Sequence, residues 1–254
     1  MEMFDNYFTY WSDLPEQDAF SVFGPDHMIW LIAEAALICV GVYIYRKKDL
    51  CKRRAMRRGI AAAMLVMEVY KDLVLIVTGH MHVQYLPLQL CGLAILVEAL
   101  YAFAPCAFLG EVMCVLCMPG AAAALIFPDW TRYPVVNFMN LHSFIVHGLL
   151  VLMPCMVLAS GEYMPRIRRV YMVFAFLIGA AFVDWCVNSL ADCNFMFLRW
   201  PSANSPFMGI YQTYGYGVYM AVYALVVCLA IFALYGVIYI VSKIDMGTRQ
   251  VEHD

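Results

Sequence analysis

Charged residues are scarce in this chain of 254 residues: they make up 14% of it, whereas hydrophobic residues make up 64%. A chain of this length needs more polar surface than that to face water, which excludes an ordinary water-soluble fold. The sequence also lacks a glycine-rich phosphate-binding loop after a strand and any nucleic-acid-binding motif. We therefore expect neither a nucleotide site nor a nucleic-acid partner, and no cofactor is predicted.

Lysine and arginine are absent before Arg46. A secretory signal has a basic segment before its apolar run and a small-residue cleavage site after it, whereas the apolar run over 28–45 has its basic residues behind it. We interpret this run as a first transmembrane helix that is retained in the mature chain.

Seven apolar stretches are long enough to cross a bilayer, whose hydrocarbon core of ~30 Å requires ~20 helical residues. We predict an all-α membrane bundle of seven transmembrane helices that forms a single domain over 1–254, with an outer N-terminal segment 1–26 and a cytoplasmic tail 243–254. The connection between the third and fourth spans is marked only by Pro105 and Cys106. The predicted spans are 27–45, 59–79, 86–104, 107–127, 137–159, 170–190 and 214–242.

The basic residues indicate the orientation, because lysine and arginine favour cytoplasmic loops. The first predicted inner loop holds eight of them: Arg46, Lys47, Lys48, Lys52, Arg53, Arg54, Arg57 and Arg58. With the N-terminus outside, Arg166, Arg168, Arg169, Lys243 and Arg249 are also cytoplasmic, and only Arg132 and Arg199 lie in outer loops. The outer segment carries Glu2, Asp5, Asp13, Glu16, Asp18 and Asp26. We predict an outer N-terminus, a cytoplasmic C-terminus and a basic loop that meets anionic lipid headgroups.

Aromatic and cysteine residues are first given structural interpretations. The run Tyr211, Tyr214, Tyr216, Tyr219 and Tyr223 begins at the outer end of the seventh span, where an interfacial aromatic belt is expected. Most of the ten cysteines fall inside predicted helices, where small buried thiols pack, and no disulfide is predicted.

Ionisable residues inside the spans form an intramembrane charge cluster: Glu34, Glu68, Lys71, Asp72 and Asp184. Such residues are costly in lipid and mark a bundle interior or a hydrated cavity. Glu68, Lys71 and Asp72 are spaced by three and four, so one face of the second span can pair its own charges. This group is either a structural latch or a site for a polar headgroup or a proton.

The third span is predicted to begin at Leu86 and to place Gln89 and Cys91 just below the outer surface. A thiol and an imidazole at similar depth are the minimum for nucleophilic acyl transfer, because the imidazole takes the thiol proton and the thiolate attacks an ester carbonyl. Amide donors nearby would hold the oxyanion.

The fifth span supplies the imidazole. Asn137, Asn140 and His147 fall on one helical face by the 100° rule, whereas His142 points roughly the other way. His147 is therefore the histidine that we group with the asparagines. From the residues alone, packing roles for Cys91 and His147 stay open.

Three segments resemble a bacterial integral membrane family, the YwaF-like proteins: Leu86 to Cys91, Tyr133 to Gly148, and Asn188 to Pro201. This family is similar to the eukaryotic transmembrane protein 164, regarded as a Cys-dependent acyltransferase of ether-linked phospholipids. The resemblance implies Cys91 as nucleophile and His147 as general base. The chain departs from the family at Gln89, where a histidine is common, and at Phe195, where a tyrosine is common.

These observations favour an acyltransferase that acts on phospholipid or lysophospholipid through a Cys thioester in an outward-opening cavity. The resemblance favours the plasma membrane, as a bacterial inner membrane, and membrane lipids are both solvent and substrate. Candidate substrate-binding residues are Gln89, Asn137, Asn140, Asn188, Asn194 and Arg199.

Two alternatives use the same residues differently. A transporter or ion-binding bundle would couple the intramembrane charges and leave Cys91 to pack. A metal site at the outer mouth would use His80 and His82 with Asp192 or Cys193, but nothing marks a closed ligand set, so no metal is predicted.

Overall fold

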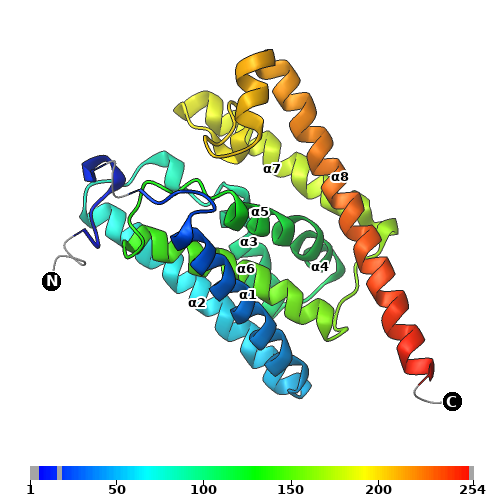
Figure 1. Ribbon diagram of the computed structural model, residues 1–254. Coiled ribbons are helices and arrows are strands. Elements are labelled where there is room, and N and C mark those ends of the chain that lie inside the picture. The colour runs from blue at the N-terminus through cyan, green and yellow to red at the C-terminus, as the bar shows by residue number, and fades with distance from the viewer. Residues whose placement is uncertain (1–5, 16–18, 252–254) are drawn as a thin grey trace.

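The computed structural model describes residues 6–15 and 19–251, and all regular structure within them is helical, as predicted (Figure 1). The acidic residues Glu2, Asp5, Glu16 and Asp18, and the last three residues of the predicted tail, lie outside the described ranges. The α-helices and one π-helix are α1 (Pro25–Arg46), α2 (Leu50–Val77), α3 (Leu90–Phe103), α4 (Ala107–Val112), the π-helix η5 (Met113–Cys117), α5 (Met118–Ile126), α6 (Phe138–Ala159), α7 (Val170–Ala191) and α8 (Phe207–Val251). Short 3-10 helices are η2 (Trp11–Asp13), η4 (Val83–Tyr85), η6 (Ile167–Arg169) and η7 (Phe195–Phe197).

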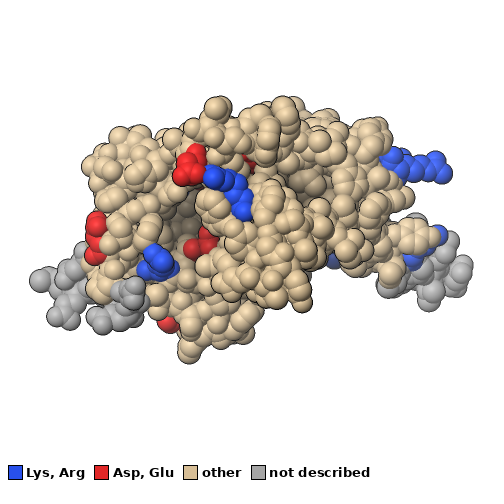
Figure 2. Space-filling model, turned by 90° about the horizontal axis from the view of Figure 1, so that it is seen from above, with Lys and Arg blue, Asp and Glu red and all other residues tan. Residues whose placement is uncertain are grey.

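Six helical segments of the described chain are long and apolar enough to cross a membrane: Pro25–Arg46, Val83–Phe103, Ala107–Ile126, Phe138–Ala159, Ile167–Ala191 and Phe207–Lys243. The helix α2 has 28 residues, but Glu68, Lys71 and Asp72 interrupt its apolar stretch. The protein is therefore a multi-pass membrane protein, and the predicted count of seven depends on α2. Figure 2 shows the matching surface, on which charged side chains gather toward the two ends and the middle is nearly free of them.

The helix α6 lies at the centre of the bundle and packs against α1, α2, α3 and α5. The rings of Trp30 in α1 and Phe144 in α6 stack with centroids 4.7 Å apart. One helical turn further along each helix, the Glu34 carboxylate lies against the backbone of Gly148, where any Cβ would collide with it. The absence of a side chain at Gly148 thus lets α1 and α6 approach each other.

The fourth predicted span is one continuous stack of α4, η5 and α5 with a π-helix in its middle. The connection at Pro105 and Cys106 separates it from α3, as predicted. Pro119 follows the π-helix and has no N–H to give to the preceding turn, which is a local reason for the wider turn. All five residues of η5 are buried.

The helices α7 and α8 flank this bundle on one side (Figure 1). The helix α7 packs on the bundle mainly through α4, and α8 packs on it mainly through η5. The Tyr235 hydroxyl of α8 donates to a carboxylate oxygen of Glu111 at 2.7 Å. Gly215 bends α8 with φ 78° and ψ −178°, a backbone region that is essentially restricted to glycine. The seventh span was predicted to begin at 214, close to this bend.

Part of the basic loop is structural rather than lipid-facing. Arg57 is 4% exposed, donates to the Tyr45 hydroxyl at 2.6 Å and pairs with Glu162 of the α6–α7 loop. Arg53 lies 3.6 Å from the same carboxylate group and donates to the Tyr45 carbonyl oxygen. The expectation that the whole loop only meets headgroups is therefore too simple, because these two arginines fasten α2 to the end of α6.

We expect Arg57→Ala to lower the free energy of unfolding by about 3 kcal/mol, because it leaves a partly buried carboxylate without its main partner. Arg54→Ala, at an exposed position of the same helix, is the matched control and should change it by less than about 0.5 kcal/mol. Reversible unfolding in mixed micelles measures both values. Equal effects of the two substitutions would contradict the structural role of Arg57.

Candidate functional site

The charged face of α2 is internally paired, as its spacing predicted. The Lys71 ammonium donates to Glu68 and lies 3.4 Å from a carboxylate oxygen of Asp72. Lys71 is buried. A cation shared by two carboxylates reduces the cost of placing all three groups in a helix bundle.

The second oxygen of Glu68 faces α6. It lies 3.5 Å from the Nε2 atom of His142, which is buried. Helical angles assigned the two histidines to opposite sides of the fifth span, and His142 is the one that lies against Glu68.

His147 has a defined tautomer. Its Nδ1 atom lies 2.6 Å from the carbonyl oxygen of Ser143, and a carbonyl oxygen only accepts, so Nδ1 carries the proton. The ring stacks on Trp130 with centroids 4.8 Å apart. No hydrogen bond of its Nε2 atom is found in the described ranges. The lone pair of this imidazole is therefore on Nε2.

Cys91 is the second residue of α3 and is partly buried. The predicted start of this helix at Leu86 is wrong, because Pro87 stands in a turn before it and Gln89 is the N-cap. A Cβ at Gly92 would lie 2.7 Å from the Cα atom of Pro87, so this turn packs tightly on the helix start. The thiol therefore lies in the first turn, where backbone N–H groups have no intrahelical acceptor.

The structure brings Cys91 into the same neighbourhood as the α2 charges. The helix α3, which carries Cys91, packs against α2 and α6, which carry Glu68 and His147. Within the described chain no hydrogen bond joins Cys91 to His147 or to Glu68.

Three of the predicted substrate-binding residues hold the loop that follows α7. Asn188 accepts from the Phe195 N–H at 2.7 Å and donates to its carbonyl oxygen at 3.1 Å. Gln89 accepts from the N–H of Met196 at 2.8 Å, and Asn194 accepts from the N–H of Arg199 at 2.9 Å.

The other three also have protein partners. Asn137 caps α6 and donates to the carbonyl oxygens of Asn6 and Thr9 at 2.8 and 2.9 Å. Asn140 donates to the carbonyl oxygen of Val135, and Arg199 pairs with Asp192. A substrate contact for any of the six stays a prediction.

Three tyrosines of α8 form hydrogen bonds to the same loop. The hydroxyls of Tyr216, Tyr219 and Tyr223 donate to the carbonyl oxygens of Leu198, Phe197 and Met196 at 3.1, 2.6 and 3.4 Å. Met196 and Phe197 have positive φ of 51° and 54°, which is unfavourable for residues with a side chain. The tyrosines, interpreted from the sequence only as an aromatic belt, thus hold a strained segment in place.

Two of the predicted charges are unpaired. One carboxylate oxygen of Glu34 and both of Asp184 have no hydrogen-bond partner in the described chain, although both residues are buried. Both oxygens of Glu98 are in the same state. Glu98 is a lone acid in the third predicted span, but it was not included in the predicted charge cluster.

The family model described as the TMEM164 family matches residues 22–239. The chain belongs to the TMEM164 family. The match begins before α1 and ends within α8, so it contains every candidate catalytic and substrate-binding residue and the whole intramembrane charge cluster. A search of curated proteins found no match, and neither did a search of solved structures. TMEM164 membership supports the predicted relation to transmembrane protein 164, whereas the YwaF-like name is not confirmed.

We expect Tyr219→Phe in this TMEM164 protein to lower the free energy of unfolding by about 1 kcal/mol, because the Phe197 carbonyl oxygen loses its donor. Tyr214→Phe removes a hydroxyl from a residue that is 68% exposed on the same helix and should have almost no effect. Thermal unfolding in detergent compares the two. An unchanged midpoint for Tyr219→Phe would show that the loop does not depend on this bond.

Proposed function

We propose that this protein is a membrane-embedded acyltransferase that moves an acyl chain from a phospholipid through a thioester on Cys91. The observations that support it are a thiol in the first turn of α3, a histidine on α6 whose Nε2 atom has no hydrogen-bond partner in the described chain, the packing of α3 against α6, and membership of the TMEM164 family. A thiol at a helix start, a carboxylate and an imidazole with a basic Nε2 are the components of nucleophilic acyl transfer.

In the proposed first half-reaction the Nε2 atom of His147 takes the Cys91 proton as the thiolate attacks the ester carbonyl carbon. The carbon–sulfur bond forms, the ester carbon–oxygen bond breaks, and the departing lysophospholipid oxygen takes the proton back. In the second half an acceptor hydroxyl gives its proton to His147 and attacks the thioester, which releases the thiol. Glu68 stabilises the imidazolium in both halves.

We place this site in the outer half of the membrane. Counting α2 as a span gives seven crossings, since its 28 residues extend about 42 Å. Because lysine and arginine favour cytoplasmic loops, we expect the basic loop between α1 and α2 in the cytoplasm and the N-terminal segment outside, and an odd count then puts the C-terminus in the cytoplasm. The membrane in question is the plasma membrane, as a bacterial inner membrane, and lipid is the partner.

We expect a lipid-like thiol electrophile to label Cys91 selectively in nanodiscs, because of the helix start and the nearby base. His147→Ala should slow labelling by about tenfold or more, since general bases contribute on the order of 10²-fold or more to such steps. Intact mass and peptide mapping measure the rate and the position.

Cys155→Ser is the control for this experiment, because Cys155 is also partly buried but packs against Met118. It should leave labelling unchanged, and Cys91→Ser should abolish it. A folded protein whose Cys91 does not react would remove the proposal.

The unpaired carboxylates support a second candidate, a bundle that binds protons or cations. In that case neutralising the α2 cluster by Asp72→Asn should abolish cation-dependent stabilisation or transport in proteoliposomes. For a thiol enzyme the same substitution should leave turnover within about threefold, because Glu68 and Lys71 remain paired. Loss of turnover with Cys91→Ser but not with Asp72→Asn would favour the enzyme.

A further inference from the structure

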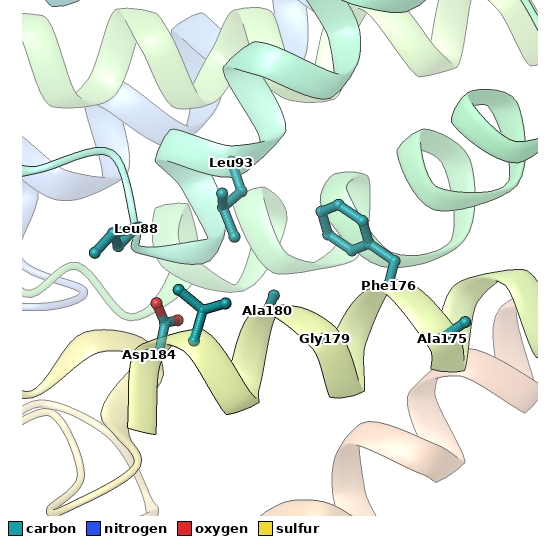
Figure 3. A pocket seen from close by; sticks show the side chains of 8 residues that line it. Leu88, Leu93, Ala175, Phe176, Gly179, Ala180 and Asp184 are labelled. Atoms are coloured by element: carbon teal, nitrogen blue, oxygen red, sulfur yellow. The ribbon is translucent and has the colours of Figure 1, made fainter. Parts of the chain in front are cut away.

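A pocket of about 300 Å³ lies between the start of α3 and α7. Figure 3 shows Leu88 and Leu93 on one side of it and Phe176, Ala180 and Asp184 on the other. All but one of its lining residues are apolar. The exception is Asp184, which is buried with neither carboxylate oxygen paired in the described chain.

The pocket opens toward lipid. Neighbouring residues of α7, Ile178 and Phe182, are 66% and 63% exposed in a helix that is apolar enough to span the membrane. Along α7 the lining runs from Ala175 to Asp184, which is ~14 Å of helix. This length is about half of the ~30 Å hydrocarbon core, the depth that one acyl chain occupies in one leaflet.

The polar end of the pocket lies beside the proposed nucleophile. Leu88 lines the pocket together with Asp184 and belongs to the turn that leads into Cys91. A buried carboxylate without a partner needs a hydrogen-bond donor from the occupant. A single-chain lipid with a free glycerol hydroxyl supplies an apolar chain and such a donor at one end.

We propose that this pocket binds the acyl chain of a lysophospholipid and that Asp184 accepts a hydrogen bond from its glycerol hydroxyl. The inference rests on the proposed acyl transfer in one respect, because that reaction makes the bound lysophospholipid the acyl acceptor. The hydroxyl is then held next to the turn that carries Cys91, while the chain lies along Gly179 and Ala180.

Crosslinking of the intact protein in nanodiscs tests the pocket without requiring turnover. A lysophospholipid with a diazirine in its acyl chain should crosslink to α7 between Ala175 and Val183 and to Leu93. Gly179→Leu should reduce this crosslinking about tenfold, because a side chain there enters open space in the pocket. Gly236→Leu is the matched control, since it adds the same side chain to an equally open helical glycine of α8 outside the pocket.

Asp184→Leu tests the polar contact. It should weaken binding of the lysophospholipid probe about tenfold, because hydrogen bonds to charged groups are the stronger ones. If unlabelled diacyl phospholipid competes as well as unlabelled lysophospholipid, the glycerol hydroxyl does not contribute to binding and its assignment to Asp184 is wrong. If Gly179→Leu leaves the crosslinking unchanged, the lipid does not bind in this pocket.

The Cys91→Ser variant separates this inference from the proposed function. Crosslinking in the pocket should persist in it, because binding needs no thiol. If the wild type crosslinks in the pocket but its Cys91 is unreactive, the proposed acyl transfer is wrong and the lipid site stands. If Cys91 is reactive but the pocket does not crosslink, only the proposed lipid site is wrong.

Discussion

The carboxylate of Glu68 is the group on which the polar interior of this bundle depends. It accepts from Lys71 on its own helix and faces His142 of α6. A carboxylate with a cation on one side and an imidazole on the other is stable at a depth where an isolated charge is not. The helices that carry Cys91 and His147 both pack against α2, so this pairing is made in the part of the bundle that holds the candidate catalytic residues.

A second set of contacts fixes the loop after α7. Side chains from three helices or their ends, Gln89, Asn188 and Tyr219, bond to backbone groups of residues 195–197. Two of those residues, Met196 and Phe197, have unfavourable backbone angles, and several directed hydrogen bonds offset that cost. Polar residues that looked like ligand contacts in the sequence are therefore the means by which α3, α7 and α8 are joined at one end.

The sequence was sufficient for the helices, because hydropathy and span length follow from composition. It also predicted that Lys71 pairs with Glu68, since residues three apart meet on a helix. It failed where contacts between helices determine which side chains meet. Helical angles grouped His147 with the asparagines, but they could not show that His142 lies against Glu68 across the α2–α6 interface. The roles of Asn188 and Tyr219 were equally hidden, because their partners are backbone atoms of a loop whose shape no local pattern encodes.

The close approach of α1 and α6 at Glu34 and Gly148 links two positions that lie far apart in the chain. The carboxylate fills the space that a side chain at 148 would need. A larger residue at 148 is therefore acceptable only when residue 34 is small, and an acid at 34 requires glycine opposite. Among relatives that keep this packing, the two positions should change together or not at all.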